Sequence, residues 1–124
     1  MRILRGAGAG LPIALTAGNL IGAAPHFLSP GQRALVGALG RRRFAEMVDF
    51  TVANQARLLV AAGGLFASAD PDLDDLRFVT QQIRRLHDHE CAVVVLDDVS
   101  ERRGHRQSSG LDLLADMELV RVLR

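Results

Sequence analysis

The sequence predicts an α/β domain, a three-layer sandwich around a small, mostly parallel sheet of three to four strands. Residues 58–62 and 91–96 are continuous apolar runs, which are typical of strands buried on both faces of a parallel sheet. Between these runs, residues 73–86 place apolar side chains at steps of three and four, as an amphipathic helix does. Strand, helix and strand of these lengths predict a βαβ unit with a right-handed crossover.

The elements before this unit are less regular. Ile3-Leu4 is a short candidate strand, and Leu11–Ala24 is an apolar stretch that follows it. Arginines before this stretch give it the outline of a signal peptide, but Pro12 and Asn19 interrupt it. The stretch is also shorter than the run of about 20 apolar residues that spans a membrane. We therefore expect a cytoplasmic protein without a membrane span.

A helical pattern begins at Ser29-Pro30, because serine is a preferred N-cap and proline suits the first helical position. Gly40 is a possible end of this helix, and a second helix, or a continuation of the first, then reaches Ala56. The apolar residues of the two parts are Leu35, Val36, Leu39, Phe44, Met47, Val48, Phe50 and Val52.

The second half of the chain has clearer boundaries. Asp70-Pro71 is an N-cap signal for the helix that follows. Residues 100–110 form a polar loop, residues 111–117 a short helix, and residues 118–123 a last strand. No linker divides the chain, and 124 residues suit one domain. We therefore expect a single α/β domain over residues 1–124.

The composition excludes several enzyme classes. The chain contains no lysine, so all fifteen basic residues are arginine. A Walker A loop and Schiff-base chemistry both require lysine. The one cysteine, Cys91, lies in a predicted buried strand, where a thiol is inert. The net charge of +1 gives no strong attraction to nucleic acid or anionic lipid, and we expect neither partner.

The glycine-rich turn at Gly6, Gly8 and Gly10 suggests a phosphate site, but its spacing departs from the dinucleotide fingerprint. That fingerprint is G-x-G-x-x-G, followed some twenty residues later by an acidic residue for the ribose. Here the third glycine is missing, and no Asp or Glu lies between Gly10 and Glu46. A flexible or tightly packed N-terminal turn without a ligand is the simpler interpretation, although an anion at a following helix N-terminus remains an alternative.

A more promising edge of the sheet lies further along the chain. Gly63-Gly64 and Asp97-Asp98 follow the two best-defined strands. Because ligands of open parallel sheets bind beyond the carboxyl ends of the strands, we name these residues as candidate ligand-binding residues. The two carboxylates are also suitable ligands for Mg²⁺, although Asp often ends a strand for structural reasons alone.

Three arginines in the polar loop, Arg102, Arg103 and Arg106, complete the candidate ligand-binding set, because guanidinium groups bind phosphate bidentately. No phenylalanine lies in this loop or in Arg41–Arg43, so base stacking is not indicated. The segment His87–Cys91 has metal-ligating residue types, but no second ligand pair has suitable spacing. We expect neither a metal site nor a catalytic residue set.

The stretch DPDLDDLRFVTQQIRRLHDHECAVVVLDD, followed by a polar loop and GLDLLADMELVRVL, resembles the carboxyl half of RecA-like domains of the KaiC type. The resemblance covers about half of the chain and implies a nucleotide-binding fold. It also implies a Walker B aspartate after residues 58–62, where this chain has Ala62 and Gly63, and a Walker A lysine, which is absent. Only the position of Asp97-Asp98 matches. The resemblance thus implies a degenerate member without ATP hydrolysis.

These observations favour a non-catalytic regulatory or scaffolding module that binds another protein or a second copy of itself, without a cofactor. The apolar stretches Leu11–Ala24 and Phe44–Val52 are more than one small sheet is expected to cover. The alternative is a protein that binds ATP, NAD, a cyclic dinucleotide or another phosphate, through the glycine-rich turn or the loop Arg102–Arg106.

Overall fold

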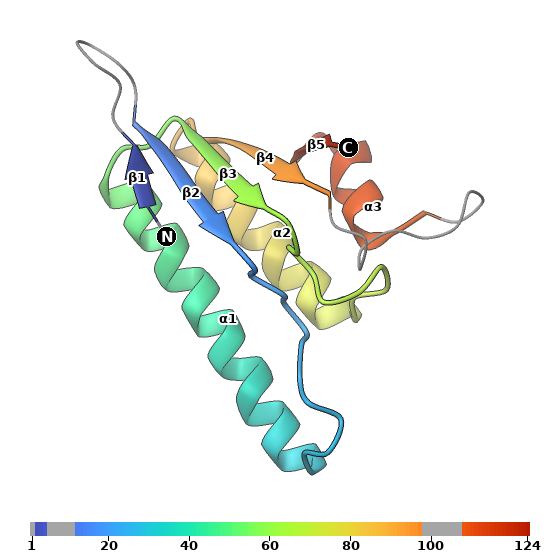
Figure 1. Cartoon of the computed structure of the whole chain (residues 1–124). Helices are drawn as coiled ribbons and strands as arrows, with labels where there is room; N and C mark the ends of the chain where they lie inside the picture. The colour runs from blue at the N-terminus through green and yellow to red at the C-terminus, as the bar shows by residue number, and fades with distance from the viewer. Residues whose placement is uncertain (1, 5–11, 98–107) are drawn as a thin grey trace.

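The computed structural model describes residues 2–4, 12–97 and 108–124, which form a mixed sheet and helices packed against it (Figure 1). The elements in chain order are β1 (Arg2–Leu4), β2 (Ile13–Ala17), α1 (Pro30–Ala53), β3 (Leu58–Ala62), α2 (Leu73–Asp88), β4 (Ala92–Leu96), α3 (Gly110–Asp116) and β5 (Arg121–Leu123). The α/β class is therefore confirmed. In the described residues the sheet has five strands rather than three to four.

The strands stand in the sheet in the order in which they occur in the chain, β1-β2-β3-β4-β5. β1 is antiparallel to β2, and the other neighbouring pairs are parallel. The expected βαβ unit is β3, α2 and β4, with Val60 paired with Val94. β2 was not expected as a separate strand, because the apolar stretch around it lacks a boundary signal before Gly18.

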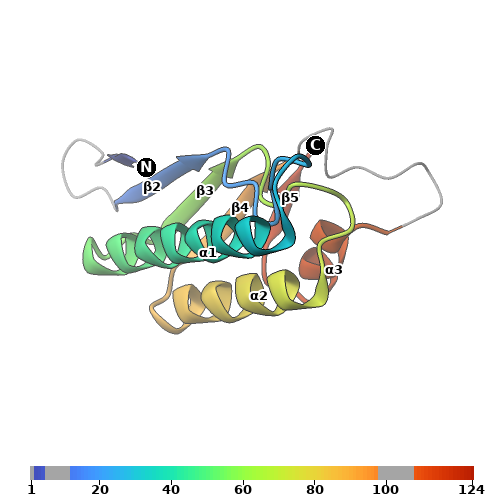
Figure 2. The same cartoon turned by 90° about the horizontal axis from the view of Figure 1, so that it is seen from below.

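The three helices lie on one face of the sheet (Figures 1 and 2). This corrects the expected three-layer sandwich, since the described residues form two layers. The reason is the strand order. Each crossover from β2 to β5 moves one strand on in the same direction, so a right-handed connection places every helix on the same side. A second helical layer requires the strand order to reverse, and between β2 and β5 it does not.

One hydrophobic core fills the space between the helices and the sheet. Alternate residues of the strands contribute to it, among them Ala14, Leu59 and Val95, each at most 2% exposed. The helices contribute Phe44, Met47 and Val48 from α1, Val79, Ile83 and Leu86 from α2, and Leu111 and Leu114 from α3. The core therefore takes only one of the two faces of each strand.

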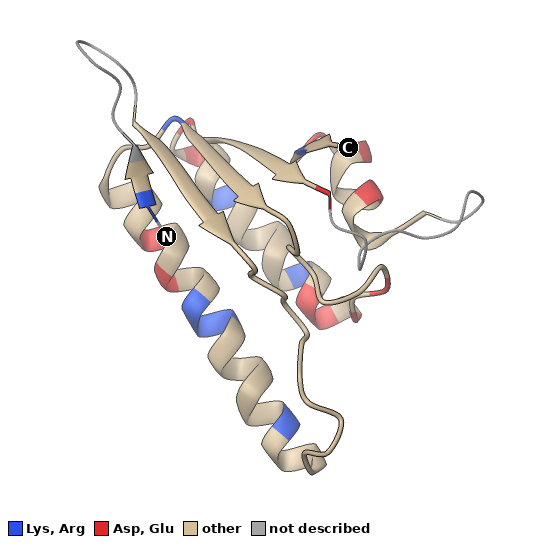
Figure 3. Cartoon of the chain, viewed as in Figure 1, with Lys and Arg blue, Asp and Glu red and all other residues tan. Residues whose placement is uncertain are grey.

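The other face of the sheet, which we call the open face, is also apolar. By pairing register, its side chains in the three middle strands are those of Ile13, Leu15, Ala17, Leu58, Val60, Ala62, Ala92, Val94 and Leu96. None of them belongs to the core or packs against it. β2, β3 and β4 carry no charged residue along their length (Figure 3). Charge on this face comes from the edge strands, with Arg2 on β1 and Arg121 on β5.

α1 is one continuous helix of 24 residues, which decides between the two helical alternatives of the sequence. It begins with a capping box, because the Ser29 hydroxyl accepts from the backbone N–H of Gln32 and the Gln32 side chain accepts from the N–H of Ser29. Its buried residues all lie in the second half, from Phe44 to Thr51. The first half extends past the carboxyl ends of the strands (Figure 1), and Leu35 there is 72% exposed.

Candidate functional site

The carboxyl ends of β3 and β4 meet as expected. Gly63 and Gly64 have φ of +68° and +65°, a left-handed conformation that glycine adopts without strain. The N–H of Gly63 donates to the carbonyl of Leu96, 3.2 Å away, and so joins the β3 end to the residue before Asp97. The carbonyls of Gly63 and Gly64 accept from Gly18 and Leu20. This glycine pair therefore extends the backbone hydrogen bonding between strands.

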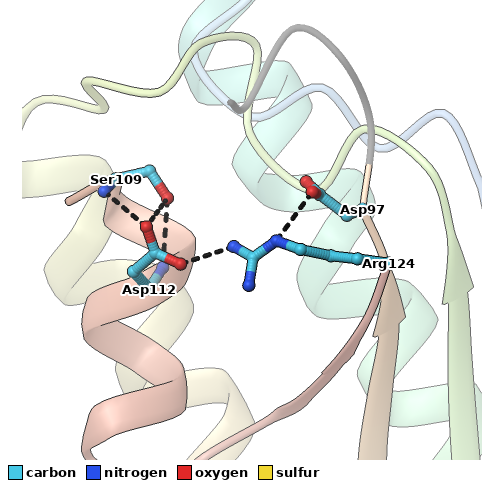
Figure 4. Close-up of polar contacts among 4 residues, drawn as sticks. All are labelled: Asp97, Ser109, Asp112 and Arg124. Atoms are coloured by element: carbon cyan, nitrogen blue, oxygen red, sulfur yellow. Dashed lines mark hydrogen bonds and ion pairs between the residues drawn. The ribbon is translucent and has the colours of Figure 1, made fainter. Parts of the chain in front are cut away.

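Asp97 lies between the ends of β3 and β5, and its carboxylate binds an arginine (Figure 4). Its side chain is 1% exposed, and Oδ2 accepts from Nε of Arg124 at 3.0 Å. Nη2 of the same arginine donates to Oδ1 of Asp112 in α3. Arg124 therefore bridges two carboxylates from different elements. One guanidinium thus offsets one of the two negative charges, and Oδ2 of Asp97 is already bound by Nε of Arg124.

Asp112 takes part in the N-terminal cap of α3. Its Oδ2 accepts from the N–H and from the hydroxyl of Ser109, at 2.9 and 3.1 Å, and the Ser109 hydroxyl accepts from the N–H of Asp112. The backbone hydrogen bond from Ser109, followed by the hydrogen bond from Arg124, lowers the pKa of Asp112. The hydrogen bond to Asp112 raises the pKa of Arg124. This cluster is thus a structural clamp that joins β4, β5 and α3.

The remaining candidate residues lie outside the described residues. These are Asp98, Arg102, Arg103 and Arg106, together with Gly6, Gly8 and Gly10 of the glycine-rich turn. Whether the arginine loop approaches Gly63 and Asp97 stays a prediction, and the phosphate-binding alternative that depends on it is not tested.

The His87–Cys91 segment divides between two elements. His87 is in the last turn of α2, His89 is its C-cap, and Cys91 precedes β4. Cys91 is a free thiol, 2% exposed, and desolvation by burial raises its pKa. Within the part of the chain that the structure describes, no three His, Cys, Asp or Glu residues are grouped as metal ligands.

A cavity that the sequence did not indicate lies between the carboxyl end of β2 and α1. It has a volume of about 250 Å³ and is lined by Thr16, Ala17, Gly18, Asn19, Gly40, Arg43, Phe44 and Met47. The sequence showed Arg41–Arg43 as a cluster, but not which arginine lies beside β2. That depends on the rotation of α1 about its axis, which is set by the burial of Phe44 and Met47.

A second, shallower hollow of about 620 Å³ lies at the β1–β2–β3 side of the sheet, with Arg2, Leu15, Thr16, Ala17 and Ala62 around it. Leu15, Ala17 and Ala62 belong to the open face, so this face is hollowed near its carboxyl edge.

No described helix is long and apolar enough to cross a membrane. Comparison with known proteins finds no matching family model and no matching curated protein, so nothing identifies the chain as a RecA-like domain.

Proposed function

We propose that the protein is a non-catalytic interaction module that binds a second copy of itself through the open face of its sheet. The observation that supports this most is the aliphatic surface of β2, β3 and β4, which no described helix covers. Strands without alternation are typical of sheets covered on both faces. A partner surface would supply the layer that the chain's own helices do not.

The size of the open face fits a functional patch. Same-face residues of a sheet occupy roughly 32 Å² each, given about 4.8 Å between strands and about 6.7 Å between alternate residues. The aliphatic side chains of the middle strands therefore cover roughly 300 Å² in plan, which is within the range of the largest and often functional patches on monomers. Leu96 and Leu123 on this face are 38% and 49% exposed.

A second copy is the partner that the shape of this face favours. Two sheets pack face to face about 10 Å apart when both present apolar side chains. Arg2 and Arg121, at the two edges, remain at the hydrated rim in such a pair. The contact would bury about twice the area of one face, which is below the usual size of a stable interface. We therefore expect a weak dimer, with Kd in the micromolar range or above.

The experiment is sedimentation of the wild type and of two variants over a range of concentrations. Val60 lies at the centre of the open face, between Leu15 and Val94. Val60→Glu introduces a charge there and should give a monomer at every concentration. The isosteric Val60→Thr adds no charge and should weaken the dimer at a smaller cost to the fold. Leu73→Glu is the control, because Leu73 is 82% exposed on the helical layer. A wild type that stays monomeric would overturn the proposal.

Localisation in the cytoplasm belongs to the same proposal. It is supported by the single cysteine of the sequence, since disulfides are the usual mark of oxidising compartments. The absence of lysine supports the non-catalytic part, because it removes the nucleophile of Schiff-base enzymes and the Walker A lysine.

A further inference from the structure

The cavity between β2 and α1 lies where α/β proteins bind small molecules, at the carboxyl end of a parallel strand next to a helix. We infer that it binds a fragment-sized organic acid, with an oxyanion held by Asn19 and Arg43 and an apolar body against Phe44 and Met47. Of its lining residues, Ala17 alone also belongs to the open face, at the carboxyl edge of β2.

The first observation is an amide that lacks an acceptor. The hydroxyl of Thr16 donates to Oδ1 of Asn19 at 3.1 Å, which leaves Nδ2 of Asn19 as the free donor of that amide. Nδ2 is buried and has no hydrogen-bond partner among the described residues. A buried donor without an acceptor is destabilising, and Asn19 lines the cavity, so a small turn of this side chain that brings Nδ2 to a ligand oxygen is stabilising.

The second observation is the charge beside the cavity. Arg42 and Arg43 both bind the same carboxylate, that of Glu46, at 3.3 and 3.1 Å. Two guanidinium groups therefore share one negative charge, and Arg43 alone of the two lines the cavity. Arg43 is 73% exposed, so its head can turn towards a ligand at little cost. The donors at this site, a guanidinium and an amide N–H, are those that bind an oxyanion.

The third observation is the absence of a side chain at Gly40. A Cβ at Gly40 would meet no atom within 4 Å. Part of the cavity is therefore open because residue 40 has no side chain. Glycine inside a helix is less favourable than alanine. The volume of about 250 Å³ is just below that of sites for drug-sized ligands, which begin near 300 Å³. A single ring with an acidic group is the size that fits.

The experiment follows backbone amide shifts of the whole chain as benzoate or phenyl phosphate is added, with benzyl alcohol as the neutral analogue. The two acids distinguish a carboxylate from a phosphate head group. We expect saturable shifts of Gly18, Asn19 and Gly40 with at least one acid, and none with benzyl alcohol. No saturable shift with either acid, or the same shifts with benzyl alcohol, would overturn the inference.

Two pairs of variants test the assignment of the site. Arg43→Gln should weaken binding about tenfold or more, as loss of a charge-assisted hydrogen bond does, whereas Arg42→Gln should leave it nearly unchanged. Gly40→Leu should abolish binding by filling the cavity, whereas Gly37→Leu should not, because Gly37 has equally open surroundings but does not line the cavity. Equal effects within either pair would show nonspecific attraction and contradict the inference.

Discussion

Asp75 is the one described acidic residue that the fold buries against an arginine of another helix. It is 6% exposed, and its Oδ1 accepts from Nη1 of Arg41 in α1 at 3.2 Å. Desolvation is the main cause that raises its pKa, followed by the nearby charge of Asp72, while Arg41 lowers it. The folded protein therefore binds a proton at Asp75 more readily than the unfolded chain does.

This shift gives a prediction on pH. The contribution of Asp75 to stability is fully present below its unfolded pKa of about 3.8 and is lost as the pH rises through the raised folded pKa. Asp75→Asn keeps the neutral form, so the free energy of unfolding should fall less between about pH 4 and about pH 7 than in the wild type. Urea unfolding at both pH values measures this. An unchanged pH dependence would contradict the burial of this carboxylate.

The pKa shift of Asp112 has the opposite sign from that of Asp75. Its pKa is lowered, so its contribution to stability is present above the unfolded pKa of about 3.8 and is lost as the pH falls through the folded pKa.

Ser109, the hydrogen-bond partner of Asp112, is the N-cap of α3. Ser109→Ala should lower the free energy of unfolding by about 1 kcal/mol. Ser108→Ala, at an exposed neighbouring position, should change it little, and equal losses in thermal or urea unfolding would show that the cap is not formed.

At the scale of the elements, two glycines in helices should respond in opposite ways to alanine. A Cβ at Gly110 in α3 would lie 2.5 Å from Cγ of Pro71, in a ring that cannot swing aside, whereas a Cβ at Gly37 in α1 would meet nothing. Gly110→Ala should therefore destabilise the protein by about 1 to 3 kcal/mol, and Gly37→Ala should stabilise it by about 1 kcal/mol. Thermal unfolding of the two variants is the measurement, and a stabilising Gly110→Ala would contradict the contact between α3 and Pro71.

The elements also show what the sequence could predict. The βαβ unit of β3, α2 and β4 was predictable because its apolar periodicity and its strand lengths agree. The predicted N-cap Asp70 was wrong by two residues, since the side chain that caps α2 is that of Asp72. The number of layers was not predictable in the same way. An apolar, non-alternating strand indicates two apolar faces, but it does not state whether the chain's own helices cover both.

The candidate site, like the fold, was predictable only in part. The meeting of Gly63 with the end of β4 was predictable from the parallel register. The bridging of Asp97 and Asp112 by Arg124 was not, because it joins residues 12 to 27 positions apart through side-chain geometry. The cavity at Asn19 and Arg43 was missed for a related reason. It depends on how far α1 is rotated against β2, and neighbouring arginines in a sequence give no signal of that rotation.

At the scale of the whole molecule, the strand order explains both proposals. Because every crossover from β2 to β5 moves in one direction, all the described helices lie on one face and leave the other face apolar and open. The same order places the cavity between β2 and α1 on the helical side. Ala17 alone belongs to both the cavity lining and the open face, and Val60 does not line the cavity. Val60→Glu should therefore leave the benzoate-induced shifts of Asn19 and Gly40 unchanged.

The central claim is that two copies meet through the open face, and intermolecular contacts between methyl groups test it most directly. A sample that mixes isotope-labelled and unlabelled chains reports, by filtered nuclear Overhauser effects, only contacts between different copies. We expect such contacts among Leu15, Val60 and Val94, which neighbour one another on that face. Intermolecular contacts confined to exposed helical residues such as Leu35 and Leu73, or none at all at concentrations where the chain associates, would contradict the claim.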